Sequence, residues 1–252
     1  MTQILAIVNQ KGGVGKTTTA INLGAGLGAL ENRVLLVDCD PQGNATRGLG
    51  QTAEEPHLYH ALIGECPARE AIHPTGFPNL DILPSNRELV GVEVEFVGQQ
   101  GWEQRLRALL GQIAGEYDLI FLDCPPSLGH LTVTALAAAD QVLVPLQCEY
   151  FALEGVSELM ATVRRVQGGI NPSLDMNGIL LTMYDDRTNL SKDVADEIRS
   201  HFAPKVYNTV VPRNIRLAEA PSHGLPIFQY DIKCRGATAY LDLAREFMER
   251  AA

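Results

Sequence analysis

Three glycines and a Lys-Thr pair near the start of the sequence are the residues whose types and spacing point most directly to chemistry. Gly12, Gly13 and Gly15 precede Lys16 and Thr17. Glycines allow successive backbone N–H groups to turn toward an anion without a Cβ in the way. A lysine in this position can reach the β- and γ-phosphates of a nucleotide, and the threonine hydroxyl can ligate Mg²⁺. The spacing therefore predicts a binding site for a nucleoside triphosphate and Mg²⁺.

The flanking segments have the patterns needed to hold such a loop. Residues 4–8 are a short apolar run of strand length, and residues 20–30 are small and apolar with helical spacing. A helix that begins at the end of the glycine loop adds its free amides and the positive end of its dipole to the anion site. The order strand, glycine loop, helix is that of a P-loop.

The loop departs from the ordinary P-loop pattern at one position. The pattern G-x-x-x-x-G-K-[ST] requires glycine at position 10, where this sequence has Gln10 followed by Lys11. A second lysine therefore lies five residues before Lys16.

Acidic residues follow two other apolar segments of strand length. Asp38 and Asp40 follow residues 33–38, and Asp123 ends residues 118–123. In a parallel sheet, ligands bind outside the carboxyl ends of the strands, so these carboxylates should face the glycine loop. Asp38 or Asp40 can hold an attacking water or the Mg²⁺ shell, and Asp123 should act on Mg²⁺ through water.

The remaining pattern predicts a single α/β domain over residues 1–252, with a doubly wound, mostly parallel sheet and helices on both faces. Further strands are expected at residues 80–84, 141–147, 178–184 and 206–211. Further helices are expected at residues 102–114, 129–139, 153–166, 191–202 and 237–250, with Ser191 as the N-cap of the fourth. Residues 51–79, which contain four prolines, should form short helices and loops.

Composition excludes several classes of protein. With 252 residues, 46% of them hydrophobic, the chain can bury a large core, and no apolar run is long enough for a membrane span. No signal peptide is evident, and five widely spaced cysteines indicate reduced thiols in the cytoplasm. His57 and His60 form an H-x-x-H pair without a third ligand nearby in the sequence, which favours a pair in a surface loop.

Positive charge is concentrated late in the chain. The net charge is −10, which argues against a protein that coats nucleic acid. Residues 187–252 nevertheless hold 10 of the 20 basic residues and only 8 of the 30 acidic ones. Whether these basic residues form a patch depends on the fold.

The loop with its second lysine resembles the deviant Walker A motif of the ParA/MinD class of P-loop ATPases. The similarity covers nearly the whole chain and is closest to the short chromosomal partition ATPases called Soj or ParA. Residues 37–46 resemble the switch I of that family, and residues 123–128 resemble its switch II. Further similar stretches are residues 147–155, 187–190 and 211–224.

The resemblance implies a homodimer that encloses ATP, in which Lys11 reaches the phosphates bound by the other subunit and Glu149 lies near the dimer interface. It implies that Asp40 positions the hydrolytic water and that Asn44 lies near the γ-phosphate. Thr17 and, through water, Asp123 would hold Mg²⁺. The residues that would contact ATP or ADP are Lys11, Gly12, Gly13, Gly15, Lys16, Thr17, Thr18, Pro212 and Asn214.

The resemblance also implies partners. Arg187 and Arg216 correspond to positions where Soj-like proteins bind double-stranded DNA without sequence specificity. A ParB-like protein would stimulate a weak, Mg²⁺-dependent ATPase and release the dimer from DNA. The implied role is segregation of a chromosome or plasmid on the nucleoid in the cytoplasm.

Two other functions share the P-loop. A membrane-recruited ATPase of the MinD type needs a basic amphipathic C-terminal helix, but residues 240–252 are short and not net basic. Packing of this helix on the domain is therefore expected, without membrane binding. A metabolic enzyme of the same superfamily, such as a synthetase or an iron–sulfur reductase, needs a substrate pocket or clustered cysteines that the sequence does not reveal.

Overall fold

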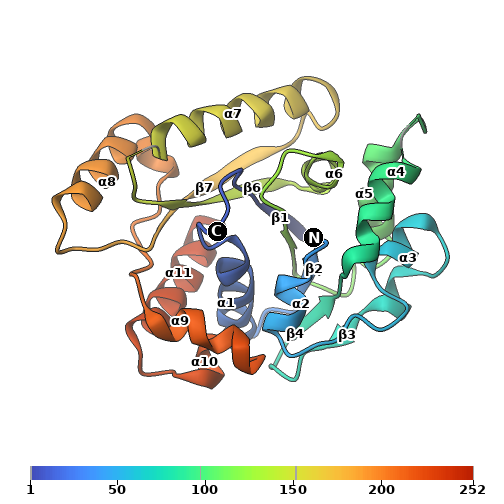
Figure 1. The fold of residues 1–252 in the computed structure, drawn as a ribbon, viewed down its shortest axis with the longest axis horizontal. Helices are drawn as coiled ribbons and strands as arrows, with labels where there is room; N and C mark the ends of the chain where they lie inside the picture. Colours follow the sequence, from blue (N-terminus) through green and yellow to red (C-terminus); the bar gives the residue numbers. More distant parts are fainter. Residues whose placement is uncertain (1, 97, 151, 252) are drawn as a thin grey trace.

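Short, buried strands form the centre of the fold. The computed structural model describes residues 2–96, 98–150 and 152–251, and within them a seven-stranded sheet has the order β3-β4-β2-β5-β1-β6-β7 (Figure 1). All neighbours are parallel except β3 and β4. The strands are β1 (Gln3–Ile7), β2 (Val34–Asp38), β3 (His73–Pro74), β4 (Leu80–Leu83), β5 (Leu119–Asp123), β6 (Gln141–Gln147) and β7 (Asp175–Thr182).

Alternating side chains of the strands pack in two apolar cores, one on each face of the sheet. Along β5, Leu119 and Phe121 point to one core, and Ile120 and Leu122 point to the other. A strand that is buried on both faces has the continuous apolar sequence seen here. The predicted fold class, a mostly parallel sheet with helices on both faces, is confirmed.

The helices divide between the two faces. Figure 1 shows α1 and α11 next to each other on one side, and their residues share a core with α2, α9 and α10. The helices α3 to α8 cover the other face. The first group is α1 (Lys16–Ala29), α2 (Asn44–Gly48), α9 (Ile215–Glu219), α10 (Ile227–Tyr230) and α11 (Arg235–Ala251). The second is α3 (Leu58–Ile63), α4 (Gly91–Glu95), α5 (Arg105–Gly111), α6 (His130–Ala138), α7 (Ala152–Gly169) and α8 (Asn189–Phe202).

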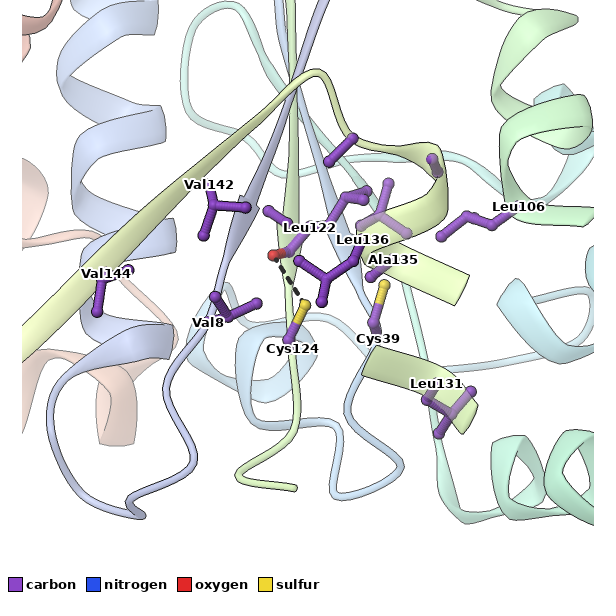
Figure 2. Close-up of a cluster of buried hydrophobic side chains, with 14 of the residues drawn as sticks. Val8, Cys39, Leu106, Leu122, Cys124, Leu131, Ala135, Leu136, Val142 and Val144 are labelled. Carbon is purple, nitrogen blue, oxygen red and sulfur yellow. Dashed lines mark hydrogen bonds between the residues drawn. The ribbon is translucent and has the colours of Figure 1, made fainter. Parts of the chain in front are cut away.

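The core under α5 and α6 includes two cysteines, each of which directly follows the aspartate at the end of a strand. Figure 2 shows Cys39 and Cys124 among apolar side chains, with the Cys124 thiol 3.6 Å from the carbonyl oxygen of Leu122. Burial raises the pKa of both thiols, so they act as small apolar groups. All five cysteines are free, as predicted.

The prediction of a last strand at residues 206–211 is wrong. This segment runs beside β7 but forms only isolated bridges with it. The N–H groups of Asn208 and Thr209 donate instead to the Glu246 carboxylate in α11, at 2.8 Å each. These amides are therefore not available to a sheet ladder.

Two predicted helix starts also differ. Helix α8 begins at Asn189, and the N-cap is Thr188, whose hydroxyl accepts a hydrogen bond from the N–H of Ser191 at 3.3 Å. Ser191 is thus the third helical residue and not the cap. The helix expected over residues 102–114 begins as a 3₁₀ turn at Trp102–Gln104, and α5 ends at Gly111.

The prediction that His57 and His60 lie in a surface loop is wrong for His57, which is fully buried at the start of α3. Its Nε2 lies 3.1 Å from a carboxylate oxygen of Glu88, in the 3₁₀ helix η2 (Arg87–Val90). Possible metal-ligand atoms of these three residues lie within 4.8 Å of one another. Because His57 and Glu88 are already at hydrogen-bond distance, we assign the pair a structural role that links α3 to η2.

Helix α11 packs its apolar face into the core. Tyr240, Leu243 and Phe247 are buried, and the Phe121 and Phe247 rings meet edge to face with centroids 6.1 Å apart. The expectation that the C-terminal helix packs on the domain is therefore met. None of the helices in the described ranges is long and apolar enough to span a membrane.

A close approach at the end of α1 makes Gly28 sensitive to substitution. An added Cβ would lie 2.6 Å from the carbonyl oxygen of Pro78. Gly28→Ala should therefore lower the free energy of unfolding by about 1–3 kcal/mol, the usual cost of overpacking, although alanine is normally favoured in helices. Urea unfolding followed by circular dichroism measures this effect.

The control is Gly168→Ala in α7, where an added Cβ meets nothing within 4 Å. This variant should gain up to about 1 kcal/mol from helix propensity. If Gly28→Ala is as stable as the wild type, the close approach of α1 to the backbone at Pro78 is not rigid.

Candidate nucleotide-binding site

The loop between β1 and α1 has the backbone of an anion cradle. Gly13 and Gly15 have φ values of +76° and +88°, which favour glycine. Helix α1 begins at Lys16, and no side chain caps its N-terminus. The free amides of its first turn can therefore bind phosphate.

Two polar residues that sequence analysis missed hold this loop in place. The Asn9 side-chain amide donates to the carbonyl oxygen of Pro145 at 2.8 Å, and its Oδ1 accepts from the N–H of Lys11 at 3.0 Å. The Thr182 hydroxyl donates to the carbonyl oxygen of Val14 at 2.8 Å. Both residues follow or end a buried strand at the same edge of the sheet, and this position was the only signal for them in the sequence.

The P-loop lysine, Lys16, is largely buried. The Lys16 side chain returns to the loop, and its Nζ donates to the carbonyl oxygen of Lys11 at 3.1 Å. Burial lowers the pKa of Lys16, while the nearby Asp123, Cys124 and Asp40 raise it. The ammonium group thus lies among groups that favour its positive charge.

The structure brings Asp123 to the same place as the P-loop. In the sheet register Asp123 pairs with Ile7 on one side and Asp38 on the other. Asp123 is fully buried, and neither of its carboxylate oxygens has a hydrogen-bond partner among the described residues. Burial and then the charge of Asp38 raise the pKa of Asp123 well above its ordinary value. A buried carboxylate without partners fits a site for a cation or its coordinated water.

Asp38 and Asp40 have different roles. Asp38 accepts hydrogen bonds from the Thr46 N–H (2.8 Å), the Thr46 hydroxyl (2.7 Å) and the Asp40 N–H (3.2 Å). Among the described residues, the Asp40 carboxylate accepts only from the N–H of Gln42. Asp38 therefore shapes the loop after β2, whereas Asp40 keeps an oxygen free for water. Asn44, which the resemblance placed near the γ-phosphate, is exposed at the start of α2.

A cavity of about 310 Å³ opens beside the P-loop. The structure places the predicted adenine residues Pro212 and Asn214 in its lining, together with Gly15 and Thr18. The Asn214 Oδ1 caps α9 by accepting from the N–H of Arg216 at 2.8 Å, so its amide group remains for a ligand. The mainly apolar lining and the position beside the phosphate cradle suit a purine base. Other lining residues, which sequence analysis missed, are Thr182, Met183, Leu217 and Tyr240.

The second lysine lies outside the phosphate cradle. The Lys11 side chain is 53% exposed and forms an ion pair with Glu149, which follows β6. Residue 151, in the family-like stretch 147–155, lies outside the described residues. The Lys11 side chain therefore faces solvent, whereas the Lys16 side chain points into the loop.

The two arginines predicted to bind DNA pair with acidic neighbours. Arg187 contacts both carboxylate oxygens of Asp185, at 2.9 and 2.8 Å, and lowers the pKa of that carboxyl group. Arg216 contacts Glu219 at 2.9 Å and Asp231 at 3.4 Å. Both arginines are exposed.

Comparison with known sequences decides the family. The sequence matches the AAA-domain family over residues 2–176. It is 53% identical to the chromosome partitioning protein ParA of Caulobacter vibrioides over 252 residues, which covers 98% of this chain and 94% of ParA. The sporulation initiation inhibitor protein Soj of Bacillus subtilis is also 53% identical, with 98% of each chain covered. The chain belongs to the ParA/Soj family of chromosome-partitioning ATPases.

Solved structures confirm the P-loop fold but include proteins of other function. Cobyrinic acid a,c-diamide synthase from Mycobacterium smegmatis, solved with ADP and magnesium, matches with a TM-score of 0.87 and 37% identity, covering 100% of this chain and 96% of the synthase. The cell division ATPase MinD of Pyrococcus furiosus matches with a TM-score of 0.82 and 26% identity over both full chains. The fold alone therefore does not select the ParA/Soj activity. The relatives at 53% identity carry that assignment.

The buried Asp123 carboxylate should destabilise the ParA/Soj fold when no ligand is bound. Asp123→Asn removes the charge and should raise the free energy of unfolding, because a buried charge without a hydrogen-bond partner costs more than a buried neutral amide. The pKa of Asp123 is higher in the folded protein than the ordinary 3.8, so the folded state holds the proton longer. The stability of the wild type should therefore fall as the pH rises above about 4, and the variant should lack this part of the loss.

Thermal unfolding of both proteins without nucleotide at pH 5 and pH 8 measures the effect. The stabilisation by Asp123→Asn should be larger at pH 8. The exposed Asp193→Asn in α8 serves as the control and should change little. A variant less stable than the wild type at both pH values would contradict the strain assigned to Asp123.

Proposed function

We propose that this chain is a DNA-partition ATPase whose ATP-bound form is a homodimer. The observation that carries this proposal is the different exposure of the two lysines in one loop. Lys16 is buried in its own subunit, whereas Lys11, five residues earlier, is exposed at the surface. A P-loop hydrolyses ATP slowly until a second cation reaches the transferred phosphate, and a facing subunit can supply Lys11 for this purpose.

The cofactors are ATP or ADP and Mg²⁺. Bound Mg²⁺ neutralises negative charge on the phosphate oxygens. Lys16 and the amides at the start of α1 bind the phosphates, and Thr17 and Asp123 would hold the ion, Asp123 through water. Asp40 orients the attacking water with its free oxygen, while Asp38 keeps the loop in place through Thr46.

We attribute DNA binding to the basic residues that are concentrated in the last part of the chain. Residues 187–252 carry a net charge of +2 in a chain of net charge −10. Arg187 and Arg216 contact backbone phosphates, so binding depends little on base sequence. A dimer presents each contact twice and strengthens a weak patch through avidity. Stimulated hydrolysis, with a ParB-like partner, returns the chain to a monomer and releases it from the nucleoid of the cytoplasm.

The packing of α11 argues against the MinD-type alternative. A membrane-binding amphipathic helix must expose its apolar face, but the apolar face of α11 is buried in the core. The metabolic alternative is favoured by the structural match to the diamide synthase. The higher identity to partition proteins over nearly the full chain favours partition.

Co-sedimentation with double-stranded DNA in ATP, in ADP and without nucleotide tests the proposal. ATP-dependent sedimentation is expected, and it should weaken as salt rises. Replacing both Arg187 and Arg216 with glutamate should abolish it while the ATP-dependent dimer persists. The matched control is the replacement of Arg107 and Arg165, which are exposed in α5 and α7, with glutamate. Binding to liposomes in place of DNA supports the MinD type, and binding to neither supports a metabolic enzyme.

Lys11→Ala tests the trans role of the second lysine. The variant should still bind ATP, because Lys16 and the loop amides are intact, but it should not dimerise. Size-exclusion chromatography with light scattering in a non-hydrolysable ATP analogue measures the mass. Lys192→Ala, an exposed lysine in α8, should dimerise normally, and Lys16→Ala should lose nucleotide binding. A normal dimer of Lys11→Ala rules out the trans role.

A further inference from the structure

A second, larger cavity lies next to the adenine pocket. Its volume is about 740 Å³, and it is bordered by the turn after β7, the irregular segment beside β7 and the first half of α11. Pro212, Arg213 and Ile215 line both this cavity and the adenine pocket. One short segment thus separates the nucleotide pocket from the second cavity.

Three arginines and three aspartates line the second cavity, and one of the arginines lies outside the ion pairs. Each aspartate in the lining has a basic partner on the same chain. The pairs are Asp185 with Arg187 (2.8 Å), Asp186 with Arg235 (3.7 Å) and Asp242 with Arg245 (3.4 Å). Arg213 is exposed and has no ion pair among the described residues. Among the described lining residues, Arg213 is therefore the arginine whose guanidinium group is left outside these ion pairs, and its charge acts on the carboxyl group of Asp185 only from a longer distance.

The backbone of Arg213 is held at the boundary between the two cavities. Its N–H donates to the carbonyl oxygen of Tyr184 at 3.2 Å, and the N–H of Val211 donates to Leu181 in β7 at 2.9 Å. The guanidinium group remains available, since none of the described residues that line the cavity forms an ion pair with it. An arginine fork of this kind binds phosphate through two parallel hydrogen bonds.

We propose that Arg213 contacts a backbone phosphate of double-stranded DNA and links this contact to the adenine pocket. The inference rests on the proposed function, because it places a further DNA contact in the partition ATPase. Arg187 and Arg216 must first leave direct ion pairs to bind phosphate, whereas Arg213 forms none among the described residues and interacts with Asp185 only through its charge. An adenine packed against Pro212 restrains the segment that carries Arg213, so the filled pocket fixes the direction of the guanidinium group.

The test is the affinity of Arg213→Gln for a fluorescent duplex of arbitrary sequence, measured by anisotropy at several salt concentrations. Each variant is assayed at a concentration of non-hydrolysable ATP analogue that saturates it, established by separate titration. Loss of one phosphate contact should weaken binding about tenfold at low salt and lower the salt slope by about one unit for each Arg213 in contact with DNA. Arg213→Lys should keep the slope, and Arg165→Gln in α7 should match the wild type.

The outcomes separate this inference from the proposed function. If the wild type does not bind DNA with the ATP analogue, the proposed function fails and this inference fails with it. If the wild type binds and Arg213→Gln keeps both affinity and slope, only the Arg213 contact is overturned. Weaker binding with an unchanged slope also overturns it, because the loss then comes from altered structure and not from a phosphate contact.

Discussion

The register of strand β5 with its two neighbours is the constraint on which the site depends. Because β5 pairs with β1 and β2, the ends of three strands lie at one level, with Ile7, Asp38 and Asp123 side by side. The P-loop, the loop after β2 and the loop after β5 therefore leave the sheet together. A shift by two residues in either pairing would separate the phosphate cradle from the carboxylates by about 7 Å.

This register also concentrates charge in a buried place. Asp123 lies beside Asp38 without hydrogen-bond partners among the described residues, and the buried Lys16 is the nearby cation. Hydrogen bonds from Thr46 and from the Asp40 amide stabilise the buried carboxylate of Asp38. For Asp123 the Thr17 side chain and the charge of Lys16 offset only part of the cost of burial, because the pKa of this carboxyl group stays well above its ordinary value. A bound cation would relieve the remaining electrostatic strain. Pre-formed strain at a binding site exchanges fold stability for ligand affinity.

Sequence patterns predicted the parts of the site that depend on local structure. The glycine loop and Lys16 were recognisable because they lie between a buried strand and a helix, and Asp123 because it ends a buried strand. Pro212 and Asn214 were placed only through the family resemblance. Asn9 and Thr182 were missed because their partners, Pro145 and Val14, are more than 100 residues away in the chain.

Long-range contacts also explain the errors in the predicted elements. The β-branched segment 206–211 has a strand composition, but Glu246 takes two of its amides. His57 looked like a loop residue because its partner Glu88 lies 31 positions later. At the start of α8 the cap was assigned to Ser191, but the hydroxyl of Thr188, three residues earlier, accepts the hydrogen bond from the N–H of Ser191.

The ion pair between Lys11 and Glu149 makes any association through Lys11 an exchange reaction. Both side chains are about half exposed, and an ion pair of this kind contributes no more than about 1 kcal/mol. A second subunit that accepts Lys11 must replace this contact, so the net gain from the lysine is smaller than its new contacts alone suggest. The small cost of release also means that Lys11 returns readily when the partner leaves. Reversibility of this kind suits a chain that must alternate between two assembly states.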